Sequence, residues 1–190
     1  MFFFCSTHIV LYQRLCFSFL DLNNATDSES RLTALCVVCV EFDHTDTIKH
    51  NAELYYGAIT ILSKTLSMTD NHDEIRMICS AIEMAFRGSA KYVKEAYHIN
   101  GSTMFPILLR LLDRCEQSKM RYADEIILNI TKTFHYLSKI PQLRASLVRQ
   151  PGVLDSMQRV ATTPLNVVCR NARVRVIANL ANCDDNKVVM

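Results

Sequence analysis

Two cysteines and two histidines lie close together in the sequence, in a pattern that approaches a zinc-binding knuckle. Cys36, Cys39, His44 and His50 fall within the segment CVVCVEFDHTDTIKH. Zinc needs four such ligands in a tetrahedral arrangement, which polar, turn-rich segments provide. Here the two cysteines lie in an apolar run, LCVVCV, with no glycine between the ligands. The sequence therefore predicts buried helical cysteines and no metal site.

Cys79, Cys115 and the histidines also offer groups for nucleophilic catalysis, but they lie in no recognisable catalytic signature. The sequence contains no GxSxG, HExxH, Walker or dinucleotide-binding motif. Its 4 glycines are far apart and cannot build a phosphate-binding loop. No catalytic residue, no cofactor and no enzymatic activity are predicted.

Two asparagines occupy equivalent positions in two similar segments. Asn129 lies in EIILNITKTFHYL and Asn179 in RVIANLANC. In both segments the asparagine follows the pattern apolar-apolar-x, where x is any residue. An amide side chain offers both a donor and an acceptor, so a row of asparagines can bond the backbone of a bound peptide. The similarity is either a coincidence or the trace of an internal repeat, and the elements that carry these segments decide between the two.

The composition favours helices. The chain has 190 residues, 49% of them hydrophobic, with only 4 Gly and 4 Pro, which argues against a fold with many tight turns. Most of the 8 cysteines lie within apolar helical patterns, which favours a reducing compartment, the cytoplasm or the nucleus. The fold class predicted is all-α.

The first 20 residues, MFFFCSTHIVLYQRLCFSFL, are apolar but do not resemble a targeting segment. No basic residue precedes the apolar run, and His8, Gln13 and Arg14 interrupt it. A central arginine is also unfavourable in a bilayer. We therefore expect residues 1–30 to form an apolar helix and a polar link at 21–30, with no membrane partner.

Further along the chain, apolar periodicity predicts a series of helices. Asp70 is the expected N-cap of the helix that follows it, and Pro106 and Pro141 are expected in first turns. Gly57, Gly101 and Gly152 each precede a stretch of the same kind, so the pattern recurs after 44 and then 51 residues. A period of this length indicates a helical-repeat array. The predicted helices are residues 31–42, 57–68, 75–86, 91–98, 104–115, 120–139, 142–150, 153–162 and 166–183.

The last of these units resembles an armadillo repeat. PGVLDSMQRVAT followed by NARVRVIANLANCDDNK is similar to its second and third helices, with the Ala-x-Asn-Leu-Ala pattern and a later Asn-Lys. The resemblance, with HEAT repeats as the alternative, implies a right-handed α-solenoid. Its units would be residues 31–56 in part, 57–100, 101–151 and 152–190, and the chain would be a piece of a longer array, since it stops within a third helix.

In armadillo proteins the third helices line a concave groove that binds extended peptides, and asparagines there bond the peptide backbone. The resemblance implies this role for Asn129 and Asn179, unless each bonds its own helix or a neighbouring one. Importin-alpha adds a tryptophan one turn before each asparagine, where this chain has Glu125 and Arg175, so trapping of basic residues is not expected. The predicted groove residues are Arg76, Ser80, Glu83, Glu125, Asn129, Arg175 and Asn179.

The charge of the chain suggests two classes of partner. Residues 1–100 carry 8 Lys and Arg against 12 Asp and Glu, whereas residues 101–190 carry 13 against 7. Arg173 and Arg175 favour a partner with carboxylates. The sequence therefore predicts a non-enzymatic scaffold for a protein or peptide. The alternative is a protein that binds nucleic-acid phosphates through arginines of the basic half, namely Arg144, Arg149, Arg159, Arg170, Arg173 and Arg175.

Overall fold

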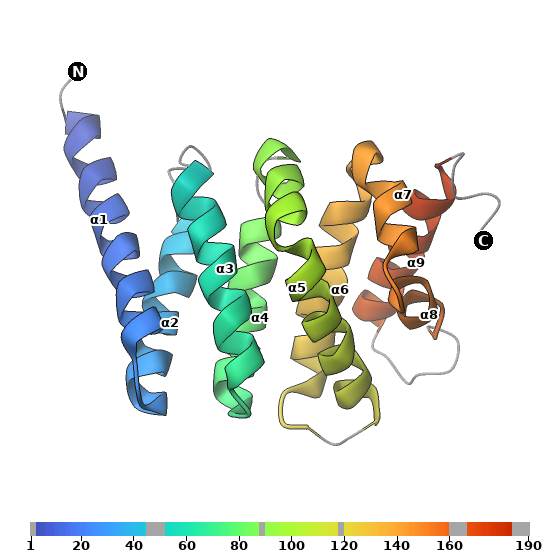
Figure 1. The fold of residues 1–190 in the computed structure, drawn as a ribbon, viewed down its shortest axis with the longest axis horizontal. Helices are drawn as coiled ribbons and strands as arrows, with labels where there is room; N and C mark the ends of the chain where they lie inside the picture. The colour runs from blue at the N-terminus through green and yellow to red at the C-terminus, as the bar shows by residue number, and fades with distance from the viewer. Residues whose placement is uncertain (1–2, 45–51, 88–89, 118–119, 160–166, 184–190) are drawn as a thin grey trace. The chain divides into compact units, whose positions relative to one another are not determined.

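The computed structural model describes residues 3–44, 52–87, 90–117, 120–159 and 167–183, and within these ranges it contains helices and no strand (Figure 1). The prediction of an all-α chain is confirmed. In the described part, no helix is both long and apolar enough to cross a bilayer. The helices are α1 (Phe3–Asn24), α2 (Ser28–His44), α3 (Ala52–Met68), α4 (His72–Phe86), α5 (Ala90–Gln117), α6 (Ala123–Ser138), α7 (Pro141–Arg149), α8 (Val153–Gln158) and α9 (Val167–Ala181).

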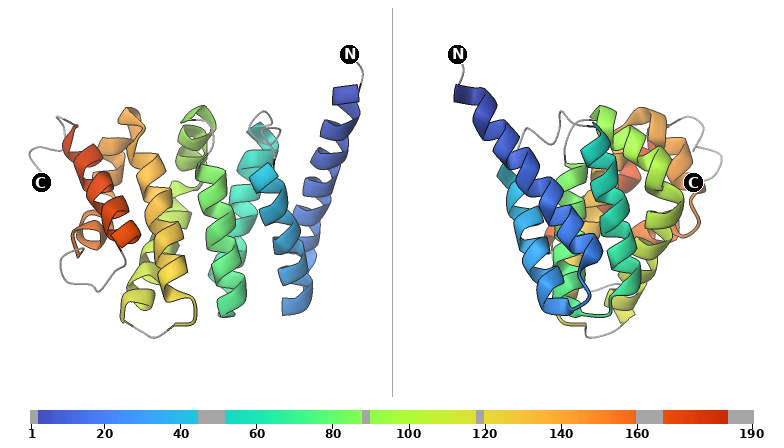
Figure 2. Two further views of the ribbon diagram at one scale, coloured as in Figure 1. Left: turned by 180° about the vertical axis from the view of Figure 1, so that it is seen from behind. Right: turned by 60° about the vertical axis from the view of Figure 1, so that its left-hand side comes forward.

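The chain divides into two compact units, residues 1–100 and 101–190, and the division falls inside α5. In the first unit, α2 packs against both α1 and α4, and α3 also packs against α1 and α4. Figure 2 shows α1 and α2 side by side, where the rings of Phe19 and Phe42 meet edge to face with centroids 6.0 Å apart. The large apolar side chains with no exposed surface among the described residues of this unit are Leu15, Leu35, Val38, Ile59, Leu62 and Ile78.

In the second unit, α6 packs against α7 and α9, and α8 lies against α7 and α9. The rings of Phe105 and Phe134 meet with centroids 5.5 Å apart. Burial of apolar side chains of this size stabilises a fold by roughly 1.5–3 kcal/mol each. The α9 helix is buried along one stripe only, at spacings of four, three and four residues, namely Cys169, Arg173, Val176 and Leu180.

Two pairs of helices, α2 with α4 and α6 with α9, run in broadly the same direction. In the first pair, Ser28 bonds Asn71 and Glu74, and Cys39 bonds the Met77 carbonyl further along both helices. In the second pair, the side chains of Thr131 and Cys169 are in contact, and Ser138 and Asn179 follow. The partners are 38 to 46 residues apart in sequence.

The start of α4 differs from the prediction by one residue. Asn71, not Asp70, is the N-cap, and its side-chain oxygen accepts from the backbone N–H groups of Asp73 and Glu74. The Asn71 amide also donates to the Ser28 hydroxyl at 2.8 Å. This second bond ties the cap to α2, which local sequence cannot reveal.

Glu74, in the first turn of α4, is fully buried and joins α4 to α2. Its carboxylate accepts from the Arg31 guanidinium, at 3.0 and 3.2 Å, and from the Ser28 hydroxyl. Burial alone would raise the pKa of Glu74, but hydrogen bonds from Arg31, Ser28 and Thr69 and the charge of Arg31 lower it below its ordinary value. The buried carboxylate is therefore kept ionised.

The region of α5 contradicts the predicted helix ends. Two helices were expected, at 91–98 and 104–115, with a break at Gly101 and with Pro106 in a first turn, but both residues lie inside one helix. The helix continues because its apolar stripe is unbroken, and tertiary packing outweighs the local cost of glycine and proline. The buried positions keep helical spacing across the expected break, namely Val93, Tyr97, Asn100, Met104, Leu108, Leu111 and Cys115.

Smaller differences affect three other predictions. Gly57 was expected to precede a helix, but it lies inside α3. The polar link expected at 21–30 is short, because α1 continues to Asn24 and α2 begins at Ser28. The expected helix 153–162 is seen as the shorter α8, and the loop expected after it lies outside the described residues.

A proline and a glycine stand at the starts of α7 and α8. Pro141 opens α7 in the first turn, as predicted, where its missing N–H costs nothing. Gly152 precedes α8 with φ 84° and ψ −10°, a left-handed conformation that favours glycine. The same residue type therefore has opposite roles at Gly152 and at Gly57.

We expect Gly152→Ala to lower the free energy of unfolding by about 1–2 kcal/mol, because L residues are strained at this φ. Gly57→Ala is the matched control. No atom lies within 4 Å of the added Cβ, and alanine is the better helix former, so unfolding should cost about 0.5–1 kcal/mol more. Urea denaturation of both variants measures the two effects, and a loss of stability in Gly57→Ala would contradict the placement of Gly57 inside α3.

We expect Glu74→Gln to lower the free energy of unfolding by about 3 kcal/mol, because it leaves a partly buried guanidinium without its counter-ion. Glu29→Gln, on an exposed site of α2, should change it by less than about 1 kcal/mol. The pKa of Glu74 is lowered, so its stabilising contribution is present above the ordinary value of 4.5 and is lost as the pH falls through the folded pKa. Thermal melts across acidic pH should show this loss in the wild type and not in Glu74→Gln.

Candidate functional site

Four of the seven predicted site residues lie on α6 and α9, which pack against each other. Glu125 and Arg175 are exposed, Asn179 is half-buried, and Asn129 keeps 8% of its surface exposed. The two asparagines lie on neighbouring helices of one unit but at different levels, because Asn179 bonds Ser138, which is nine positions beyond Asn129 on α6. We refer to Glu125, Asn129, Arg175 and Asn179 as the α6–α9 face.

The two asparagines have different surroundings. The Asn129 carbonyl accepts from the Thr133 hydroxyl at 3.0 Å, while its side-chain amide bonds no other described residue. The Asn179 amide donates to the Ser138 hydroxyl on α6 at 3.0 Å, and Ser138 donates to the His135 carbonyl at 2.8 Å. Asn179 therefore helps to join α6 to α9, and its side-chain oxygen is the part available to a ligand.

His135 lies beside the α6–α9 face, close to two positively charged side chains. Burial, with the positive charges of Lys139 on the same turn and Arg175 on α9, lowers the pKa of His135 below its ordinary value of 6.5. The imidazole is therefore neutral at pH 7. A neutral histidine between two cations leaves the region with an excess of positive charge, which favours anionic groups.

The other three predicted residues lie on α4, in the first unit. Arg76 and Ser80 are half-buried, and Glu83 is buried with 6% of its surface exposed. The helical spacing places them on one side of α4, and Glu83 is the most enclosed of the three. Its burial is close to that of Asn129, which keeps 8% of its surface exposed.

The expectation that Arg173 accompanies Arg175 in binding a partner is wrong. Arg173 has no exposed surface, and its guanidinium pairs with Glu116 and donates to the Ser156 carbonyl at 3.2 Å. Glu116 also accepts from Arg159 at 3.0 Å. Arg173 thus joins α9 to the end of α5 and to α8, and it stabilises the unit instead of contacting a ligand.

Two further arginines proposed for phosphate binding are also engaged within the chain. Arg159 pairs with Asp113 as well as with Glu116. Arg144 donates to the Ser138 carbonyl at 2.9 Å. Of the six arginines proposed for nucleic acid, the exposed ones are Arg149, Arg170 and Arg175.

The cysteines on α2 differ from the prediction in one respect. Cys36 is exposed and Cys39 is half-buried, although both were expected to be buried. Burial raises the pKa of Cys39 to about 12, which disfavours the thiolate that zinc requires. His50 lies outside the described residues, and no cluster of three potential metal ligands occurs among those described.

The thiols considered as nucleophiles are enclosed. Cys79 and Cys115 are buried, and burial raises the pKa of Cys115 to about 11. A thiol with such a pKa is protonated at neutral pH and reacts slowly, because the thiolate is the nucleophile.

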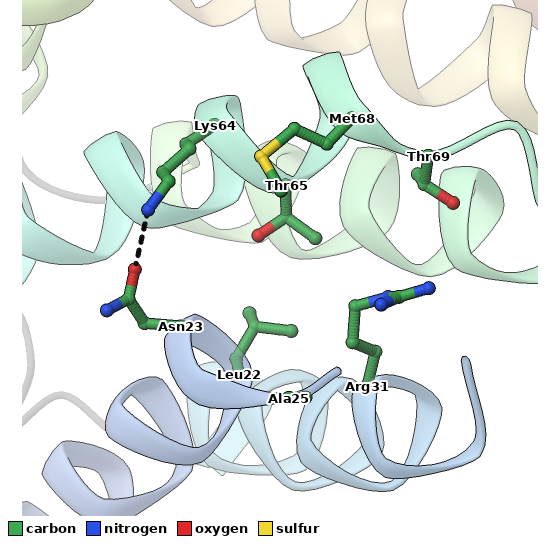
Figure 3. A pocket seen from close by; sticks show the side chains of 8 residues that line it. All are labelled: Leu22, Asn23, Ala25, Arg31, Lys64, Thr65, Met68 and Thr69. Atoms are coloured by element: carbon green, nitrogen blue, oxygen red, sulfur yellow. Dashed lines mark hydrogen bonds between the residues drawn. The ribbon is translucent and has the colours of Figure 1, made fainter. Parts of the chain in front are cut away.

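A small cleft of about 80 Å³ lies in the first unit, between the end of α1, the start of α2 and the end of α3 (Figure 3). Its two cationic residues are Arg31 and Lys64. The Arg31 guanidinium pairs with Glu74, and the Lys64 ammonium donates to the Asn23 side chain at 3.1 Å. The cleft is therefore a packing feature of three helix ends, and we assign no ligand to it.

We expect Arg175→Gln to raise the pKa of His135, because the substitution removes a positive charge that disfavours the imidazolium. Arg170→Gln, on the same helix, should leave that pKa unchanged, since Arg170 does not contribute to the shift. An NMR titration of the imidazole resonances in the three proteins measures the effect. An unchanged pKa in Arg175→Gln would contradict the positive environment described for this face.

In comparisons with known proteins, no family model matches the chain, and no curated protein or solved structure matches it.

Proposed function

We propose that the chain is an armadillo-like, right-handed helical-repeat protein that acts as a non-enzymatic interaction scaffold in the cytoplasm or nucleus. It binds an extended, acidic segment of a partner protein, and the α6–α9 face provides the main contacts. The observation that carries the proposal is the pair of asparagines on neighbouring parallel helices, with the exposed Arg175 one turn before Asn179.

The repeat architecture is supported by helix pairs of one kind in both units. The pairs α2–α4 and α6–α9 run in the same direction, with contacts between residues 38 to 46 positions apart. The helices α2, α4, α6 and α9 begin at residues 28, 72, 123 and 167. Recurring helices that stack on their equivalents are the basis of an α-solenoid.

The binding mode is supported by the amide groups that remain available. The Asn129 amide makes no hydrogen bond to another described residue, and a peptide would reach it through the 8% of the residue that stays exposed. The Asn179 oxygen adds one acceptor, while its nitrogen is held by Ser138. These groups recognise a peptide backbone, so they set the binding mode without requiring one sequence.

The acidic character of the partner follows from the charges near the asparagines. Arg175 is exposed one helical turn before Asn179, and Lys139 adds a second cation beside His135. A guanidinium binds carboxylates through paired hydrogen bonds. Glu125 is the exception on this face and disfavours a partner acid near the start of α6.

Nucleic acid remains the second candidate only through Arg149, Arg170 and Arg175. The other three arginines of the set, Arg144, Arg159 and Arg173, are half-buried or buried. Phosphate binding by few cations is weak and strongly dependent on salt. We therefore favour the peptide.

The test uses random 12-residue peptides displayed on phage and selected on the purified protein. We expect the selected peptides to be rich in Asp and Glu. Asn129→Ala/Asn179→Ala should weaken their binding about 10- to 100-fold, as expected for the loss of about two peptide hydrogen bonds. Fluorescence anisotropy with labelled peptides measures the change.

Asn24→Ala is the matched control, because Asn24 is an exposed asparagine at the end of α1, in the first unit. It should leave the affinity unchanged, and circular dichroism should show unchanged helicity in every variant. If the wild type and the double variant bind the selected peptides with equal affinity, the asparagines do not contact the peptide. Tighter binding of single-stranded RNA than of any selected peptide, with a steep loss in salt, would favour the second candidate.

A further inference from the structure

The exposed large apolar side chains of the described residues concentrate on two surfaces. Four of the nine lie on α1 and α2, three lie on α9, and the remaining two, Met68 and Ile99, lie elsewhere. Single exposed apolar residues are ordinary, but groups of them indicate sites of association. The seven residues that form the two groups are Phe17, Leu20, Val37 and Val40, and Val167, Val168 and Val174.

The first surface lies on the outer side of α9. Val167 and Val174 are exposed at 67% and 52%, and they lie two turns apart on the side opposite the buried stripe. Asn171 and Ala178 complete the row at helical spacing, and both are exposed. This row is narrow enough to enter a groove between two helices, and we call it the α9 ridge.

The second surface is a groove between α1 and α2, with a volume of about 580 Å³. Asp21 and Asn24 on α1, and Thr33 and Val37 on α2, are among the residues that line it. Phe17 and Leu20 lie one turn before Asp21 and Asn24, and Val40 lies one turn after Val37, so they extend the two walls. Figure 2 shows these two helices side by side.

The two surfaces carry opposite charges. The charged residues that line the groove are Asp21 and Glu29, both exposed. The charged residues of α9 are all arginines, of which Arg170 and Arg175 are exposed beside the ridge. The ridge, which is flanked by arginines, is thus complementary in charge to the groove, whose lining is mostly polar and carries two carboxylates.

We propose that the α9 ridge of one copy of the chain binds the α1–α2 groove of a second copy. The contact buries Val167 and Val174 against Phe17, Leu20 and Val37, and it pairs the arginines with Asp21 and Glu29. This repeats between two molecules the side-by-side helix packing that joins α6 to α9 within one. The interface is heterologous, since each copy contributes a different surface, and it can therefore extend to a third copy.

The first test measures mass against concentration for the wild-type chain by sedimentation equilibrium. We expect the average mass to rise above the 21.7 kDa of one chain as the concentration increases, without a stop at the dimer. High salt should weaken the association, because ion pairs contribute to it. A mass that stays at one chain throughout would overturn the proposal and leave both surfaces to other partners.

The second test uses one variant for each surface. Val174→Asp disables the ridge and Phe17→Asp disables the groove, while each leaves the other surface intact. Both variants should be monomeric alone, and an equimolar mixture should form a dimer of one copy of each. Ile99→Asp, at an exposed apolar residue on neither surface, should associate like the wild type.

The mixture separates this arrangement from a symmetric dimer. A ridge that bound a second ridge would leave Phe17→Asp dimeric alone, and a mixture that stayed monomeric would rule out pairing of ridge with groove. Either result would overturn the proposal. Circular dichroism and thermal melting confirm that each variant is folded, and because Val174 does not belong to the α6–α9 face, Val174→Asp should still bind the selected peptides.

Discussion

Each unit contains a buried carboxylate that is held by arginine from a neighbouring helix. Glu74 accepts from Arg31, and Glu116 accepts from Arg173, which has no exposed surface. Ions are expensive to bury, and the cost is offset only when the partners meet with good geometry. Two helices that meet only through apolar stripes can shift by one turn with little loss of contact energy. A shift of one turn would separate the two partners of a buried ion pair. The pairs therefore define how the helices align, and with that the positions of the side chains that remain outside.

The α9 helix shows how one element can serve three purposes through angular position alone. Arg173 and Val176 face the interior, Asn179 and Arg175 lie beside α6, and Val174 points away from the buried stripe. Because successive residues are rotated by about 100°, neighbours in sequence face different surroundings. The interior contact through Arg173 holds the helix in place, and this rotational setting leaves Arg175 and Val174 exposed on different sides of the helix.

Periodicity was sufficient to predict the all-helical class and the approximate extents of α4, α6, α7 and α9, because each has a regular apolar stripe or a proline start. It failed at Gly101 and Pro106, where burial on both sides of the expected break keeps α5 helical. It also failed at Arg173, since its partner Glu116 is 57 residues away and an arginine is normally exposed. Asn129 and Asn179 were found by their shared pattern, but the bond from Asn179 to Ser138 depends on packing that no local pattern contains.

The most direct measurement of the central claim is hydrogen–deuterium exchange of the chain with and without a selected acidic peptide. If the α6–α9 face binds the peptide, slower exchange should concentrate in peptic segments that contain Asn129 and Asn179, and it should disappear in Asn129→Ala/Asn179→Ala. Protection that falls on other helices, or that persists in the double variant, would contradict the account.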